Sequence, residues 1–247
     1  MSSKLLGFKI FTDQLKNINF RKKIIINTIN PHSLIVAKRD MVFHESLKSS
    51  TYLVPDGIGI VLAFLLIKNK LIKRITGFKV HEFLINKANY KGYKVFYFGS
   101  SNETLQAIKK KNSEFFPKLD IMYYSPPYKK EFTKSENNFF IKKINDFKPD
   151  ILFVGMTAPK QEKWVYNNYK KIDCKIFSTI GAVFDFYAGR IKRAPQIFIL
   201  LGLEWFYRFL QEPKRLFQRN FISAPKFLFY LFIEKIKNIF KSIFKPF

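Results

Sequence analysis

The chain has 247 residues, of which 47% are hydrophobic, and carries a formal net charge of +26 from 44 Lys and Arg against 18 Asp and Glu. This apolar content is enough for a folded core and argues against a disordered chain, while the single cysteine, Cys174, excludes an internal disulfide and fits a reducing compartment. The charge favours a polyanionic partner such as nucleic acid, anionic lipid or a phosphorylated substrate, although the same lysines also fit a solvated surface without a specific task.

Short apolar runs alternate with helical segments along most of the chain. Pro31 predicts the first turn of a helix that continues to about Lys48, a second helix is expected from about Glu103, and Pro159 opens a third. The predicted buried strands are 24–29, 52–54, 95–98, 121–124, 151–154 and 176–180. This alternation of strand, polar turn and helix predicts an α/β fold with a parallel sheet and helices on both faces.

Polar or small residues occupy the predicted strand ends: Thr28, Asp56, Gly99, Gly155 and Gly181. Ligands of open parallel sheets bind beyond the carboxyl ends of the strands. We therefore expect these residues to converge on one crevice, although they lie far apart in the sequence.

The last part of the chain, from Gly202 onwards, has a helical pattern, with breaks expected at Pro213 and Pro225. Apolar residues then recur at Phe232, Ile236, Ile239, Phe240 and Ile243, with lysines on other faces. A basic, phenylalanine-rich amphipathic helix suits an anionic membrane surface. The alternative is a helix packed on its own domain or on another subunit, and a homo-oligomer stays open.

Arginine is concentrated near this region. Of eight arginines, five fall between positions 190 and 219, namely Arg190, Arg193, Arg208, Arg215 and Arg219. In a chain that otherwise uses lysine, arginine indicates a need for the planar fork that binds phosphate or carboxylate.

Two segments at strand ends carry groups suited to ligand binding. Gly99-Ser100-Ser101 precedes a helix and fits either a phosphate on backbone amides or an ordinary helix cap. Gln161 and Glu162, at the start of the third helix, offer an amide and a carboxylate for ribose hydroxyls or a base edge. Glu162 also suits a simpler role, that of complementing the helix dipole.

Taken together and in order, the motifs resemble those of the WecG/TagA/CpsF family of bacterial glycosyltransferases, from about Asn27 to Arg219. The resemblance rests on Pro-Asp-Gly at 55–57, Pro-Lys-Gln-Glu at 159–162, Phe-Asp-x-x-Ala-Gly-x-x-x-Arg-Ala-Pro at 184–195 and Gly-Leu-Glu-Trp-x-Tyr-Arg at 202–208. None of these is specific alone.

The resemblance implies a Rossmann-like catalytic core at 1–195 with a helical C-terminal appendage at 196–247. It implies an inverting transfer without metal or cofactor, from a UDP-sugar to N-acetylglucosamine on a polyprenyl diphosphate, in surface polysaccharide synthesis. N-acetylmannosamine is the main donor sugar expected, with its uronic acid, glucose and glucuronic acid as alternatives. Such a protein would lie on the inner face of the cell membrane; residues 1–13 show no secretory signal and no apolar run reaches the roughly 18–20 residues of a membrane span.

The resemblance also implies roles for individual residues. Asp56 is the proposed base, Thr28 lies in the same pocket, and Arg208 and Arg215, with Arg219 as a third candidate beside Gln218, hold the diphosphate. The residues assigned to substrate contact are Asn30, Gly57, Arg74, Gly99, Gly155, Pro159, Lys160, Gln161, Glu162, Asp185, Arg190 and Arg193. Lys79 stands where relatives often have Asp, which we expect to affect donor or acceptor choice.

The residues agree with this mechanism in one respect. Metal-dependent sugar transferases commonly use an Asp-x-Asp pair, and the chain contains none. Fixed arginines or amides must then meet the charge of the leaving group, and a single base suffices for a direct inverting displacement. The rival hypothesis, a basic nucleic-acid-binding module, rests on net charge alone and lacks zinc-ligand spacing or a recognition motif.

Overall fold

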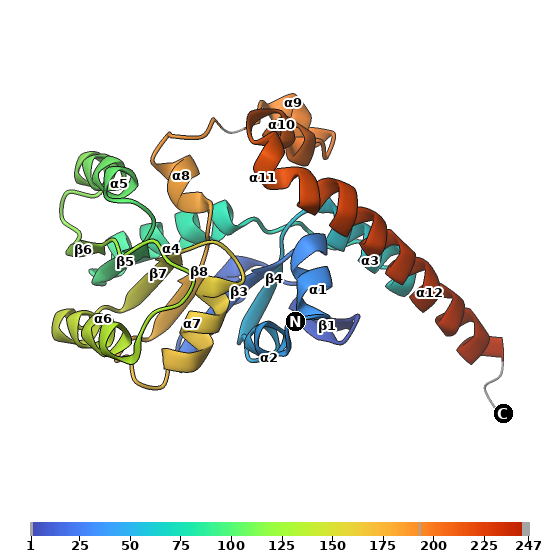
Figure 1. Cartoon of the computed structure of the whole chain (residues 1–247), viewed down its shortest axis with the longest axis horizontal. Coiled ribbons are helices and arrows are strands. Elements are labelled where there is room, and N and C mark those ends of the chain that lie inside the picture. The colour runs from blue at the N-terminus through green and yellow to red at the C-terminus, as the bar shows by residue number, and fades with distance from the viewer. Residues whose placement is uncertain (1, 193, 244–247) are drawn as a thin grey trace.

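The computed structural model describes residues 2–192 and 194–243, and its centre is a single eight-stranded sheet (Figure 1). The strands run in the order β1-β2-β4-β3-β8-β7-β5-β6. Their bounds are β1 (Ser2–Leu5), β2 (Phe8–Phe11), β3 (Ile24–Ile29), β4 (Tyr52–Pro55), β5 (Val95–Gly99), β6 (Ile121–Tyr124), β7 (Ile151–Gly155) and β8 (Ile176–Thr179). All neighbouring strands pair in parallel except β1 and β2. The α/β fold with a parallel sheet is therefore confirmed, and each of the six predicted strands is found to within one residue.

The antiparallel β1–β2 pair was missed by the sequence analysis. Its two-residue turn, Leu6-Gly7, has φ values of +48° and +87°. Such left-handed conformations are typical of tight hairpin turns. The pair extends the sheet at its β4 edge, and its residues do not line the crevice described below.

Helices cover both faces of the sheet, as expected (Figure 1). Their bounds are α1 (Pro31–Ala37), α2 (Met41–Lys48), α3 (Ile58–Lys68), α4 (Gly77–Lys91), α5 (Asn102–Phe115), α6 (Lys134–Phe147), α7 (Lys160–Asn168), α8 (Val183–Tyr187), α9 (Gln196–Leu200), α10 (Glu204–Gln211), α11 (Pro213–Phe217) and α12 (Ala224–Ile243), with a 3₁₀ turn at Leu15–Asn17 and a π-helix, η2, at Gln218–Ser223. Alternate strand residues separate two cores. In β5, Tyr97 packs with α4, α5 and α8, whereas Phe96 and Phe98 pack with α6 and α7.

The single helix predicted from Pro31 to Lys48 is wrong, because two helices occupy this stretch. Asp40 begins the second one, and its carboxylate accepts a hydrogen bond from the Phe43 backbone N–H at 2.9 Å. A side chain that satisfies the free amides of a helix start favours a new helix at that point.

The breaks predicted in the tail had different outcomes. Pro213 does begin a new helix, α11. Pro225 does not interrupt the helical path; it lies in the first turn of α12, directly after the π-helix η2. The preceding π-helix joins α11 to α12, so residues 213–243 form one continuous helical segment beside α3 (Figure 1).

The first half of α12 packs against the rest of the protein. Phe227 and Leu231 are buried in a cluster with residues of α1, α2 and α3. Further along, Phe229, Phe232, Ile236 and Phe240 expose 37–64% of their surface. Within 2–192 and 194–243, no helix is long and apolar enough to cross a membrane.

Candidate functional site

A large crevice lies at the carboxyl ends of the parallel strands, where the sequence analysis placed it. Residues directly at or after the ends of β3, β4, β6, β7 and β8 line it together with residues of α10, η2 and α12. Its volume is about 1630 Å³, larger than the roughly 300–1,000 Å³ of a typical small-molecule site. The crevice therefore has room for two substrates at once.

Asp56 is fixed by the ends of the two strands β3 and β4. Its backbone N–H donates to the Ile29 carbonyl at 2.8 Å, which continues the pairing that sets Thr28 opposite Val54. Gly57 follows with φ +92°, a conformation that favours glycine, and α3 begins at the next residue. The local backbone thus holds the carboxylate at the wall of the crevice.

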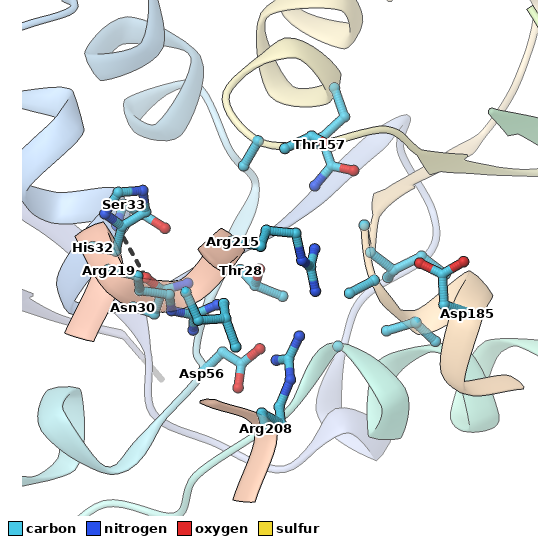
Figure 2. Close-up of a pocket in the computed structure, with 18 of the residues that line it drawn as sticks. Thr28, Asn30, His32, Ser33, Asp56, Thr157, Asp185, Arg208, Arg215 and Arg219 are labelled. Atoms are coloured by element: carbon cyan, nitrogen blue, oxygen red, sulfur yellow. Dashed lines mark hydrogen bonds between the residues drawn. The ribbon is translucent and has the colours of Figure 1, made fainter. Parts of the chain in front are cut away.

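Three arginines influence the charge of Asp56. Burial raises the pKa of Asp56 above its ordinary value, Arg219, Arg74 and Arg208 lower it, and Glu204 raises it. Burial and the neighbouring Arg208 lower the pKa of Arg219 to about 10, so its guanidinium stays charged at neutral pH. Figure 2 shows the side chains of Arg208 and Arg215 pointing into the space between Asp56 and Asp185.

Two side chains of the crevice, an arginine and an asparagine, have buried donor atoms that lack a hydrogen-bond acceptor. Among the described residues, neither Arg208 Nε nor Asn220 Nδ2 has a hydrogen-bond partner, and both side chains line the crevice. A buried donor without an acceptor costs about 1–3 kcal/mol. Acceptor oxygens supplied by a bound oxyanion would remove that cost, so these side chains are suited to a phosphate group.

Arg74 is engaged by the tail. Its Nη2 lies 2.5 Å from Glu204 Oε2, and both side chains are largely buried. The backbone N–H of Ile75 donates to the Pro55 carbonyl at 2.9 Å, which keeps Arg74 beside Asp56. The ion pair therefore ties α10 to the loop that pairs with the end of β4 beside Asp56.

The opposite wall is built at the start of α5. Arg190 Nη1 donates to Ser101 Oγ at 3.0 Å and to Thr104 Oγ1 at 2.8 Å, and the Thr104 hydroxyl donates to Asp185 Oδ1 at 3.4 Å. Burial raises the pKa of Asp185, while Arg215 and Arg190 lower it. This wall offers hydroxyl and carboxylate groups of the kind that bind a nucleoside.

Gln161 and Glu162 lie buried at the start of α7. Gln161 Oε1 accepts from the Met156 backbone N–H at 3.1 Å, and Gln161 Nε2 donates to Glu162 Oε1 at 2.8 Å. Glu162 Oε2 has no partner among the described residues, and burial raises the pKa of Glu162 to about 7. The amide of Gln161 is thus used within the protein, whereas Glu162 retains an oxygen for a ligand.

Lys160 joins the crevice through a loop that the sequence analysis missed. Its Nζ donates to the Lys129 carbonyl and lies 3.7 Å from the centre of the Phe132 ring. Residues 125–130, which follow β6 and contain Pro126 and Pro127, line the crevice. This loop also follows the carboxyl end of a parallel strand, so the reasoning that predicted the position of Asp56 could have predicted this loop too.

Most of the predicted site residues come together in the crevice. Those that line it are Thr28, Asn30, Asp56, Gly57, Arg74, Gly155, Lys160, Gln161, Glu162, Asp185, Arg190, Arg208, Arg215 and Arg219. The proposed roles of these residues stay predictions. Asn30 also has a structural task, since its side chain caps α1 by accepting from the Ser33 N–H at 3.0 Å.

A few predicted residues lie elsewhere. Gly99 and Pro159 do not line the crevice; Gly99 (φ +122°) packs against the Gly155 backbone, and Pro159 precedes the first turn of α7. Arg193 lies outside the described residues. Lys79 is exposed in the first turn of α4 and faces a separate shallow hollow with Leu15, so its charge does not enter the crevice.

Sequence reasoning also missed Asn220 and Glu204 as members of the site. Asn220 directly follows Arg219, but no pattern of residue types marked it. Glu204 lies in the Gly-Leu-Glu-Trp motif, and a carboxylate among basic residues was a usable signal. Within 2–192 and 194–243, no three His, Cys, Asp or Glu side chains gather as a metal-binding group.

The comparisons with known proteins agree with the motifs. The model of the "Glycosyl transferase WecG/TagA/CpsF family" matches residues 6–240. An N-acetylglucosaminyldiphosphoundecaprenol N-acetyl-beta-D-mannosaminyltransferase of Bacillus subtilis (strain 168) is 35% identical over 234 residues, covering 93% of this chain and 88% of the relative. Proteins of the same name from Staphylococcus aureus strains MW2 and MRSA252 are 30% and 31% identical over 214 residues, covering 87% of this chain and 82% of each relative.

Proposed function

The chain belongs to the WecG/TagA/CpsF family of glycosyltransferases, and we propose that it transfers N-acetylmannosamine from a UDP-linked donor to N-acetylglucosamine on a polyprenyl diphosphate. The observation that carries this proposal is a half-buried carboxylate, Asp56, whose charge is influenced by three arginines in a crevice large enough for two substrates. The names of the relatives describe an acceptor and a sugar of the same kind.

In the proposed reaction, Asp56 accepts the proton of an acceptor hydroxyl as the hydroxyl oxygen attacks the anomeric carbon of the donor. The bond between that carbon and the diphosphate oxygen breaks, and the configuration inverts. The raised pKa of Asp56 suits this role, because a general base works best when its pKa approaches the working pH.

The leaving diphosphate gains negative charge, and in this proposal Arg208, Arg215 and Arg219 stabilise it without a metal ion. Arg208 Nε and Asn220 Nδ2 would then find the acceptor oxygens that they lack. The uridine would lie near the start of α5, where Ser101 and Asp185 offer polar groups. UDP-glucose and UDP-glucuronic acid remain the alternative donors.

A transfer assay tests the proposal with purified protein, UDP-N-acetylmannosamine, a short-chain acceptor diphosphate and EDTA. We expect Asp56→Asn to lower turnover by about 10²–10⁴-fold while UDP binding is retained. Near-normal turnover of the variant would refute the assignment of the base. A requirement for a divalent cation would refute the metal-free mechanism.

We further propose that the protein binds the anionic inner face of the membrane. Phe229, Phe232, Ile236 and Phe240 form an exposed apolar stripe along α12, and Lys235 and Lys237 lie beside it. Replacement of Phe229 and Phe232 by Glu is expected to abolish co-sedimentation with anionic vesicles. Unchanged co-sedimentation would reject this role. The buried Phe227 is kept intact in the variant, so the test separates membrane contact from folding.

A further inference from the structure

The crevice changes from polar to apolar along its length. Near Asp56 it is lined by charged residues, whereas α3 and α12 line it with apolar side chains: the exposed Ile58, Leu62 and Leu228 and, beneath them, the buried Phe227 and Leu231. Figure 1 shows α12 running beside α3 and away from the sheet. The apolar part of the crevice is therefore continuous with the wall that carries Asp56.

Helix α3 carries apolar residues both on the face that packs against the protein and on its exposed face. Ile60, Val61, Ala63 and Phe64 are buried, yet Ile58 and Leu62 still expose 37% and 44% of their surface. Exposed apolar surface that lines a groove marks a binding site for an apolar partner. The groove therefore has a chemical preference that a UDP-sugar does not satisfy.

Close packing brings the groove up to the catalytic residue. Gly59 has no room for a side chain, because an added Cβ would lie 2.5 Å from Pro31 Cγ and 3.5 Å from Phe227 Cε1. Proline and phenylalanine thus pack directly on the first turn of α3. Ile58, the first apolar residue of the groove, is only two positions from Asp56.

We infer that this groove between α3 and α12 binds the first isoprene units of the acceptor lipid. The inference rests on the proposed function, which places a hydroxyl of the acceptor sugar at Asp56. The attached chain then leaves the crevice along its apolar wall, while Arg208, Arg215 and Arg219 remain with the diphosphate of the donor. Each buried methylene contributes about 0.8 kcal/mol in general, so the lipid chain itself adds to recognition.

Two matched variants of α3 test the groove. Leu62 lines the crevice, whereas Leu66, one turn further on and 47% exposed, does not. Transfer is measured in solution, without vesicles, to N-acetylglucosamine diphosphates that carry either a methyl group or a chain of about three isoprene units. We expect the wild-type protein to have the lower KM for the isoprenoid acceptor.

In Leu62→Asp, the KM for the isoprenoid acceptor should rise about tenfold or more, since burial of a leucine side chain is worth that factor. The KM for the methyl acceptor should rise much less, and Leu66→Asp, at a residue outside the crevice, should behave like the wild type with both acceptors. Leu228→Asp, on the opposite wall, should reproduce the effect. A wild-type KM that does not depend on the chain, or equal effects of the Leu62 and Leu66 changes, would overturn the inference.

A binding readout separates this inference from the proposed reaction. A benzophenone-bearing prenyl diphosphate that lacks the sugar is photo-cross-linked to the full chain, and the modified peptides are mapped. Cross-links within 58–68 and 224–238 are expected, with loss in Leu62→Asp and retention in Leu66→Asp. Cross-links elsewhere, or none, would refute the groove. If the groove is labelled while no sugar is transferred to either acceptor, the proposed reaction fails and the lipid site stands.

Discussion

Glu162 provides a sharp test of how burial sets the chemistry of the crevice. Its carboxylate is 2% exposed, and its pKa is raised from 4.5 to about 7, mainly by burial. The folded protein therefore binds a proton that the unfolded chain releases. Its stability contribution is full below pH 4.5 and is lost as the pH rises through about 7. At about 1.4 kcal/mol for each pKa unit, the loss amounts to roughly 3 kcal/mol.

The Glu162→Gln variant removes this titration while keeping the shape of the protonated acid. Its Oε1 can still accept the hydrogen bond that Gln161 Nε2 donates at 2.8 Å. We expect the two proteins to have similar free energies of unfolding near pH 5, and the variant to be more stable by about 2–3 kcal/mol near pH 8. Urea denaturation at several pH values measures the difference.

The result depends on a comparison of wild type and variant, because Asp56 and Asp185 also have raised pKa values and contribute to the pH dependence of both proteins. Only the Glu162 contribution is absent from one of them. A difference in unfolding free energy that stays constant from pH 5 to pH 8 would mean that Glu162 is ionised in the folded protein. The reasoning from burial would then be wrong.

Three further predictions concern Asp56, Arg208 and the packing of the tail. In a pH–rate profile, turnover should rise with pH through an ionisation whose pKa lies above the ordinary Asp value of 3.8, because Asp56 must lose its proton to act as base. The residual rate of Asp56→Asn should lack this rise. Arg208→Lys should raise the Kd for UDP about tenfold in a binding titration, since the buried Nε donor is lost; an unchanged Kd would remove Arg208 from the phosphate site. Phe227→Ala should lower the free energy of unfolding by about 3–5 kcal/mol, because the ring is 2% exposed, whereas the exposed Phe229→Ala should change it by less than about 0.5 kcal/mol in denaturant titrations.

The parallel part of the sheet was predictable because its strands are buried on both faces. Val95-Phe96-Tyr97-Phe98 is apolar throughout and is followed by glycine and serine, a pattern that indicates a central strand. The hairpin at the start was missed because Ser2–Leu5 is short and mixes polar with apolar residues. The break at Asp40 was missed because an aspartate inside a helical pattern becomes a cap only through its local backbone geometry.

The site was predictable where strand ends carry distinctive residues, as at Asp56 and Gly155. The tail was harder to place, because the sequence does not show which part of the sheet a terminal helix contacts. The structure shows that Phe227 and Leu231 face the core, while Phe229 and Phe232 do not. Because α12 has apolar residues on both its buried and its exposed side, the periodicity of the sequence alone did not show which side packs against the protein.

The position of the tail explains how an ordinary turn aspartate acquires an unusual environment. Asp56 follows a strand in the way that many Asp-Gly turns do, and by itself such a carboxylate would be solvated and weakly basic. Arg208 and Arg219, which offset its burial, both belong to the segment after residue 196, as does Glu204, which pairs with Arg74. That segment is held in place by Phe227 and Leu231, which pack on α1 and α3. The packing that docks the tail therefore also brings these charged groups to Asp56, and we predict that a change that loosens α12 weakens the proposed transfer without altering the sheet.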